Sequence, residues 1–517
     1  MSADAVGLYD EVFASIPEEM GAVLERSAYS PNIKERRDYS CAIFDARGRL
    51  IAQASHIPVH LGAMPLLARH LAGRFEWREG MGALTNDPYQ AGTHLPDWTL
   101  FSPVFASGDL VGFVANRAHH ADTGGKSPGS MAPSRELFEE GLVIPPTVLL
   151  EDWSPRQEIL DWILANVRGR DERLGDLQAQ IGSNRIGVRR FQNLVEHIGI
   201  AECDRRIDVL LDYSARLAEA VVNDLAPGVY SFEDFLDDDG AGRERIRIAL
   251  TLTIHDGRLT FDFTASDDQA ASLNATEAVT RSVCCYALRA LMPAESPTNE
   301  GCWRPVEVAL RPGSVVCAAY PAAVAGGNVE TSQRLTDVVL GALAQAAPGR
   351  IPAASQGTMN NLLIGGWDPF RQRDYAYYET IGGGCGAGPG WNGASGIHCH
   401  MTNTRNTPAE ALEAELPLVV EEYRLKRDSG GDGQCKGGDG VIKRIRFLAP
   451  ARVTLFGDRR RSSPYGLAGG MNGSPGGQRL IRGNETIELP AKGEADVQTG
   501  DLLIIETPSG GGYGPKV

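Results

Sequence analysis

The sequence predicts a mixed α/β (α+β) protein of several domains, with mixed sheets, a helical middle segment and a β-rich C-terminal part. The chain has 517 residues, more than a single hydrophobic core usually supports. Apolar residues recur at helical spacing in the middle of the chain and alternate with polar residues elsewhere. The expected regions are 1–134, α/β with a metal site; 135–225, helical; 226–425, mixed α/β with glycine-rich loops; and 426–517, β-rich.

The first region is expected to begin with a helix and a β-hairpin. Apolar residues at helical spacing over 7–27 predict a helix that Pro17 interrupts. The following stretch, DYSCAIFDARGRLIAQAS, alternates apolar and polar residues around Arg47 and Gly48. This pattern is typical of a hairpin. It places Asp38 at the mouth of the first strand.

Histidines and carboxylates gather between Thr85 and Gly125, in stretches rich in Gly, Pro and Asn. They are His94, His119 and His120, and Asp87, Asp97 and Asp122. Imidazoles and carboxylates that loops supply are what a divalent metal ion such as Zn²⁺ or Mn²⁺ requires. The alternative is a set of hydrogen-bonded loop groups without a metal.

A site made of Asp38, His94, Asp97 and His119 combines nitrogen and oxygen ligands. Such a set suits Mn²⁺ or Zn²⁺ and is wrong for Cu(I) or an iron–sulfur cluster. The buried strand LVGFVAN delivers the histidine pair at its C-terminal end. Adjacent side chains of an extended segment point in opposite directions, so only one of His119 and His120 is expected to bind the metal.

The remaining polar groups have other expected roles. The second histidine, taken here as His120, is a candidate for proton transfer or for contacts behind the ligands, as are Asp87 and Asp122. His56 and His60 precede an apolar helix. They are candidate ligands, but histidines in that position are more often hydrogen-bonded structural groups.

The second half of the chain offers strands, two helices and a glycine-rich tract. Alternation after residue 227 predicts a β-meander, and AVTRSVCCYALRALMP predicts a helix. The segment 313–347 predicts a strand and a loop before a helix that Asn328 could cap. The tract IGGGCGAGPGWNGASGIHCH contains G-x-G-x-x-G, but it lacks the strand and helix of a dinucleotide site. The phosphate-binding pattern G-x-x-x-x-G-K-[ST] is absent.

Composition excludes several classes of function. The net charge is −16, and no basic run is interleaved with aromatic residues, which argues against nucleic acid and anionic membranes as partners. No apolar run approaches the ~20 residues that span a bilayer. The acidic first residues do not resemble a secretion signal, and nine Cys without a C-x-x-C pair suit reduced thiols. We therefore expect a cytoplasmic protein.

Several motifs together identify a family. NDPYQAGTHLPDWT, NRAHHADTGGKSPGS, AGGNVETSQR, MTNTRNTP and the tail PSGGGYG resemble the hydantoinase B/oxoprolinase family, in this order along the chain. The resemblance implies that the family's metal ligands fall on His94 and Asp97 in GTHLPD and on His119 in AHHAD. Asp38 in RRDYS is implied as a further ligand.

The resemblance also implies a division of labour between subunits. A partner of the hydantoinase A type would bind ATP and phosphorylate the substrate, in a heterotetramer or a larger complex. The present chain would then be the metal-containing subunit of an ATP-dependent cyclic-amide hydrolase acting on a hydantoin, 5-oxoproline or a lactam, with metal-bound hydroxide as the nucleophile. The alternatives are a subunit of an ATP-dependent ketone carboxylase and a non-catalytic assembly subunit. The glycine-rich tract, Asn328 and Glu330 are candidates to line a passage between subunits.

Overall fold

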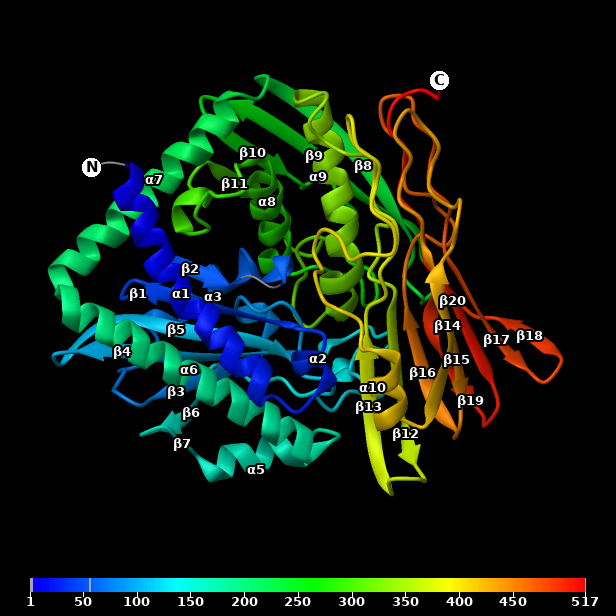
Figure 1. Cartoon of the computed structure of the whole chain (residues 1–517), viewed down its shortest axis with the longest axis horizontal. Coiled ribbons are helices and arrows are strands. Elements are labelled where there is room, and N and C mark those ends of the chain that lie inside the picture. Colours follow the sequence, from blue (N-terminus) through cyan, green and yellow to red (C-terminus); the bar gives the residue numbers. More distant parts are fainter. Residues whose placement is uncertain (1–2, 55–56, 517) are drawn as a thin grey trace.

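A computed structural model describes residues 3–54 and 57–516 (Figure 1). Its N-terminal part is a seven-stranded sheet in the order β2-β1-β5-β4-β3-β6-β7, in which the paired strands are antiparallel. The strands are β1 (Tyr39–Asp45), β2 (Leu50–Ala54), β3 (Gly82–Thr85), β4 (Asp97–Ala106), β5 (Asp109–His119), β6 (Thr147–Glu151) and β7 (Ser154–Pro155). The predicted hairpin is confirmed as β1 and β2.

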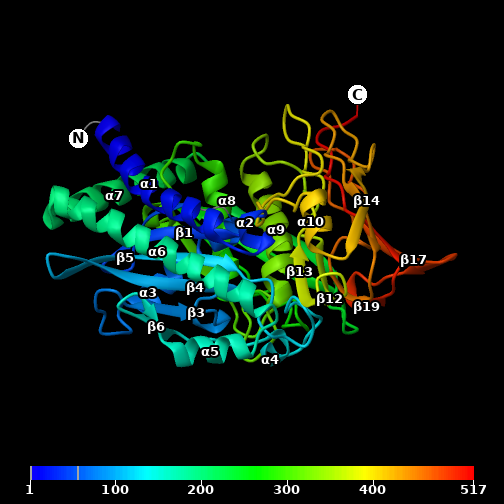
Figure 2. The same ribbon diagram turned by 60° about the horizontal axis from the view of Figure 1, so that its bottom comes forward.

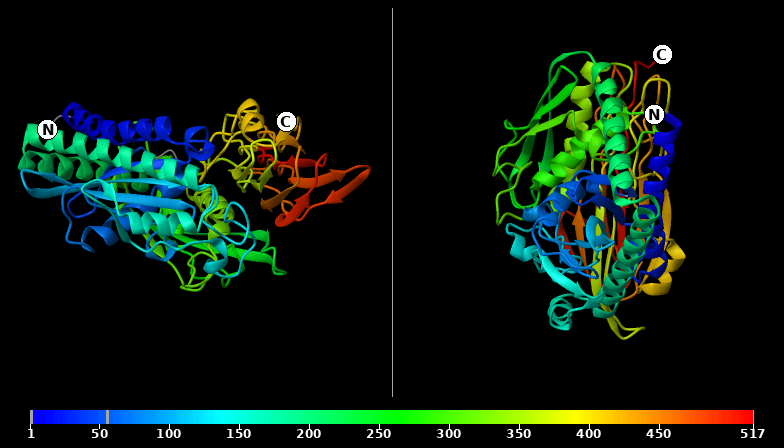
Figure 3. Two further views of the ribbon diagram at one scale, coloured as in Figure 1. Left: turned by 90° about the horizontal axis from the view of Figure 1, so that it is seen from below. Right: turned by 90° about the vertical axis from the view of Figure 1, so that its left-hand side faces the viewer.

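Helix α1 (Ala3–Ser27) and helix α6 (Arg170–Ile198) cover one face of this sheet (Figures 2 and 3). The predicted interruption at Pro17 is wrong, because the helix continues through it. Phe13, Met20 and other buried side chains of α1 join the core between the helices and the sheet. This packing offsets the backbone hydrogen bond that proline removes.

The opposite face of the sheet packs against helix α3 (Ala63–Ala72) through a separate cluster that includes Phe44, Met64, Phe101 and Phe113. Short helical segments connect the strands. They are α2 (Pro31–Lys34), η1 (Pro58–His60), η2 (Pro88–Gln90) and α4 (Leu137–Glu140).

The region predicted as helical is interrupted at its start. Residues 147–155 form β6 and β7 at the edge of the first sheet, and the long helices begin only after them. These helices are α5 (Gln157–Ala165), α6 and α7 (Ile200–Asn223). Pairing of β6 with β3 prevails over the helical pattern of the surrounding sequence.

The middle of the chain forms a four-stranded sheet covered by two helices. The strands are β8 (Gly228–Asp238), β9 (Glu244–His255), β10 (Arg258–Asp262) and β11 (Val306–Ala309), and the helices are α8 (Glu277–Leu291) and α9 (Ser332–Ala346), with η3 (Glu300–Trp303) between them. The predicted meander and both helices are confirmed. The edge strand β11 pairs in parallel with β10.

Helix α9 begins differently from the prediction. It continues directly from a π-helix, η4 (Gly327–Thr331), and Asn328 lies inside this wider turn instead of capping α9. The strand predicted before it is also wrong, because residues 314–320 form turns and isolated bridges.

The C-terminal part consists of two packed sheets, in yellow, orange and red toward the right of Figure 1. Their orders are β13-β12-β16-β19 and β14-β15-β20-β17-β18. The elements are β12 (Asn361–Asp368), β13 (Arg373–Glu379), α10 (Ala409–Glu415), β14 (Leu418–Leu425), β15 (Val441–Phe447), β16 (Ala451–Phe456), β17 (Gly477–Arg482), β18 (Glu485–Glu488), β19 (Lys492–Val497) and β20 (Leu502–Glu506). The β-rich end is confirmed, although β12, β13 and β14 precede residue 426, where the region was predicted to begin.

None of the helices within 3–54 and 57–516 combines the length and the apolar character that crossing a membrane requires.

A buried ion cluster joins α9 to the C-terminal sheets. Asp458, which is inaccessible to solvent, lies 2.8 Å from Nη2 of Arg334 and 2.7 Å from Nζ of Lys492. Burial alone would raise the pKa of Asp458, but the charges of Lys492 and Arg334 hold it well below its usual value. The carboxylate therefore stabilises the fold above pH ~4, and this contribution is lost as the pH falls toward the depressed pKa.

Replacing Asp458 by Asn removes the nearest countercharge of buried Lys492. We expect Asp458→Asn to lower the free energy of unfolding by about 3–5 kcal/mol, measured by urea denaturation at pH 7. The control is Asp496→Asn, which breaks an exposed pair with Arg452 at 3.0 Å and should cost less than about 1 kcal/mol. Equal losses in the two variants would contradict a stabilising role of the cluster.

Candidate metal centre

Three adjacent strands carry polar residues to the same end of the N-terminal sheet. Asp97 at the start of β4 is paired directly with His119 at the end of β5. On the other side of β5, the backbone N–H of His119 donates to the carbonyl of Asp38, just before β1, over 3.0 Å. His94 lies in the loop that leads into β4. Residues far apart in sequence therefore meet in one place.

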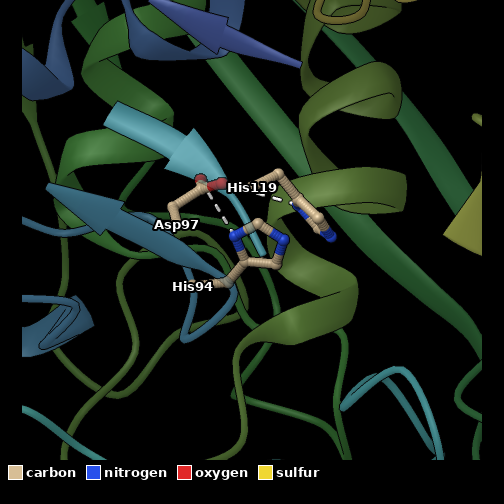
Figure 4. Close-up of side chains that lie close together, drawn as sticks. All are labelled: His94, Asp97 and His119. Atoms are coloured by element: carbon tan, nitrogen blue, oxygen red, sulfur yellow. Dashed lines mark hydrogen bonds and ion pairs between the residues drawn. The ribbon is translucent and has the colours of Figure 1, made fainter. Parts of the chain in front are cut away.

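His94, Asp97 and His119 form a compact cluster of possible ligands (Figure 4). Nδ1 of His94 lies 3.0 Å from Oδ2 of Asp97, and Nδ1 of His119 lies 3.5 Å from Oδ1 of the same carboxylate. One ligand atom from each residue lies within 4.8 Å of the others, and all three residues are buried. Nitrogen and carboxylate ligands in this number suit Zn²⁺ or Mn²⁺.

The cluster borders a cavity of about 20 Å³, which is room for about one water molecule or one ion. Nε2 of His119 is buried there without a hydrogen-bond partner. Since Nδ1 faces a carboxylate, a neutral His119 carries its proton on Nδ1 and presents a bare lone pair at Nε2. An unpaired lone pair beside a space of this size fits a divalent cation.

Burial and neighbouring charges give the side chains of the site the protonation states that bind a metal ion. Burial alone would raise the pKa of Asp97, but the charges of His94 and His60 and hydrogen bonds from His119 and His60 lower it well below its usual value. Burial lowers the pKa of His119. At neutral pH the site therefore contains an ionised carboxylate and a neutral imidazole, which are the forms that bind metals.

Asp38 lies at the edge of the cluster. Its Oδ2 is 4.0 Å from Nδ1 of His119 and 3.8 Å from Nη2 of the buried Arg36. The side chain lines the same cavity but does not belong to the compact group of three.

His60 holds Asp97 from a third direction. Its Nε2 lies 3.3 Å from Oδ2 of Asp97, and its Nδ1 lies 3.0 Å from Oγ of Ser40. This is the hydrogen-bonded role that sequence reasoning favoured for a histidine in that loop. No sequence pattern indicated that its partner would be Asp97. His56 lies outside the described residues.

His120 is not part of the cavity. It faces α6 on the other side of the sheet, where its ring stacks on Trp98 with the centroids 3.9 Å apart and its Nε2 lies 2.9 Å from Oε1 of Gln180. Burial lowers its pKa to about 4. The structure thus separates the two adjacent histidines as the extended backbone predicts, with His119 toward the cavity.

Asp122 and Asp87 also lie away from the cavity lining. Asp122 accepts hydrogen bonds from the backbone N–H groups of Gly124 and Gly129 and is paired with Arg168 at 3.0 Å. Asp87 accepts from the backbone of Tyr89 at the start of η2. Both carboxylates shape the loops around the site, and the structure does not bring them to the metal cluster.

Comparison with known proteins identifies the family. The Hydantoinase B/oxoprolinase model matches residues 5–516. The chain belongs to the hydantoinase B/oxoprolinase family. Among members of this family it is 40% identical to 5-oxoprolinase 1 of Arabidopsis thaliana over 552 aligned residues, which cover 100% of the chain but 42% of the relative. The chain thus spans about two fifths of the length of that oxoprolinase.

Solved structures share the fold. An ATP-dependent caprolactamase from Pseudomonas jessenii superimposes with a TM-score of 0.93 at 29% identity, over 100% of this hydantoinase B-type chain and 91% of its own. A nucleotide-free acetone carboxylase superimposes with a TM-score of 0.91 over 98% of this chain and 75% of its own. Its identity is 19%, so this second match shows the fold alone.

Removing a ligand should empty the centre. We expect purified wild-type protein to contain a divalent metal and the variants His94→Ala and His119→Ala to have lost most of it, measured by elemental analysis after dialysis. The control is His70→Ala, an exposed histidine on α3. Equal metal content in all four proteins would contradict a centre at this position.

Proposed function

We propose that this chain is the metal-containing B-type subunit of an ATP-dependent hydrolase of cyclic amides, acting on a hydantoin, 5-oxoproline or a lactam. The observation that carries the proposal is the buried cluster of His94, Asp97 and His119, in a chain that matches the family along its length. The names of two relatives, 5-oxoprolinase and ATP-dependent caprolactamase, support a ring-opening reaction of this class.

The chemistry explains why such a reaction needs both ATP and a metal. Resonance makes an amide planar and its carbonyl a poor electrophile. Phosphorylation of the amide oxygen removes that resonance. Addition of water to the ring carbon, proton transfer to the ring nitrogen and cleavage of the C–N bond would then leave an acyl phosphate, and a second water would release phosphate and the ring-opened acid. A divalent cation held in the cavity would lower the pKa of a bound water and supply a nucleophile at neutral pH.

The residues of this chain prepare the site for that step. His94 and His119 present imidazole nitrogens to the site, and Asp97 is held by His60 and by the hydroxyl of Thr93. We assign Asp38 as the further ligand, because it lines the same cavity from the position just before β1. Apolar side chains, among them Ile57, Val59, Met359 and Met401, form part of the wall and limit the access of bulk water.

A second polypeptide is the proposed source of the phosphoryl group. The chain lacks the G-x-x-x-x-G-K-[ST] pattern and spans 42% of the Arabidopsis 5-oxoprolinase. We assign ATP binding and substrate phosphorylation to a partner of the hydantoinase A type, in a heterotetramer or a larger assembly.

Reconstitution tests this function. The chain mixed with its A-type partner should open a cyclic amide only when ATP is present, measured as ring-opened product and ADP by chromatography. His119→Ala should lower product formation at least about 100-fold, because it removes a ligand and effects of 10–100-fold already follow loss of outer contacts. The exposed His70→Ala variant should match the wild type.

Two outcomes would contradict the proposal. A product that forms only with bicarbonate would point to a carboxylase. Full ring opening by His119→Ala would point to an assembly role for this chain.

A further inference from the structure

The cavity has a second unpaired atom besides Nε2 of His119. Asn328, on η4, is 4% exposed and lines the cavity. Its Nδ2 lies 3.4 Å from Nε2 of His94, and its Oδ1 is buried without a hydrogen-bond partner. Among the described residues that line the cavity, these two atoms are the buried side-chain polar atoms left unpaired.

Both unpaired atoms offer lone pairs. An amide oxygen only accepts hydrogen bonds, and the Nδ1 of His119 faces carboxylates, which leaves Nε2 as the ring nitrogen turned away from them. Leaving a buried acceptor without a hydrogen-bond partner is unfavourable. Two such acceptors beside a space of about 20 Å³ suit a cation, which both lone pairs could bind.

The backbone fixes Asn328 in this position. Within the π-helix, a Cβ added at Gly327 would lie 1.9 Å from the carbonyl oxygen of Asn274, so the turn packs directly on another segment of backbone. Two residues later, Glu330 accepts hydrogen bonds from the backbone N–H of Met359 and from Nδ2 of Asn361, at 3.1 and 2.8 Å. π-Helical turns often occur at functional sites. The π-helical turn is therefore held at both ends, and the side chain of Asn328 lines the cavity.

We propose that Oδ1 of Asn328 is a further ligand of the cation held by His94, Asp97 and His119. An amide oxygen is a hard donor that suits Mn²⁺ and is compatible with the mixed nitrogen and oxygen set. The inference rests on the metal centre proposed above. It extends the centre from the N-terminal sheet to η4, which lies more than two hundred residues later in the chain.

Cobalt substitution tests the assignment, because the visible d–d absorption of Co²⁺ depends on the number and type of its ligands. Wild type and Asn328→Leu are stripped of metal and titrated with Co²⁺. The leucine variant, which has a similar volume but no oxygen, should bind Co²⁺ about tenfold more weakly. At saturation its d–d bands should differ from those of the wild type in position and intensity.

The matched control is Thr404→Val. Thr404 lines the same cavity, but its hydroxyl is already bonded to Oγ1 of Thr380 at 2.7 Å. Its Co²⁺ affinity and spectrum should equal those of the wild type. Should Asn328→Leu fail to fold, Asn328→Asp serves instead, since a carboxylate in place of an amide ligand also shifts the bands.

The outcomes separate this inference from the proposed function. Wild-type protein that binds no Co²⁺ would overturn the metal centre itself. Wild-type binding with an unchanged spectrum in the saturated Asn328 variants would overturn only the role of Asn328 as a ligand. This holds even if the affinity falls, because Asn328 would then act through its contact with His94.

Discussion

The register of the hairpin formed by β4 and β5 is the constraint on which the site depends. The hairpin turns at Ser107 and Gly108, and next to the turn Ala106 pairs with Asp109. Between Val104 and Phe105 the pairing shifts by one residue, and the shifted register places Asp97 opposite His119. Without this shift every later side chain of β5 would change face. His119 would then face α6, and the cluster would not form.

A buried carboxylate is the electrostatic consequence of that register. Asp97 is 3% exposed, and an isolated charge in such a place is strongly disfavoured. Here the hydroxyl of Thr93 and the imidazoles of His60, His94 and His119 surround it. The protein therefore orders the carboxylate by contacts of its own, and the imidazoles that it orients are positioned in advance for a cation.

The sequence predicted the residues of the cluster better than it predicted the residues that surround them. His94 and Asp97 stand three residues apart, so their proximity followed from local spacing. The choice between His119 and His120 stayed open because it depends on the face of β5, which the one-residue shift sets. His60 and Asn328 reach the site from loops and turns whose paths depend on tertiary packing. The strand β6 was missed because its few residues are surrounded by helical periodicity and are stabilised by pairing with β3.

The C-terminal sheets also take part in the site, and this links its geometry to the packing of the whole chain. The ring of Tyr378, on β13, stacks on His119 with the centroids 4.5 Å apart. Its hydroxyl donates to Oδ1 of Asn361, and Nδ2 of Asn361 donates to Glu330 on η4. Tyr378, which stacks on His119, and η4, which carries Asn328, are thus joined by hydrogen bonds through Asn361. A shift of the C-terminal sheets would therefore move Tyr378 and Asn328 together. The N-terminal sheet supplies the ligand cluster, and the packing of η4 and the C-terminal sheets against it sets the distance across the cavity.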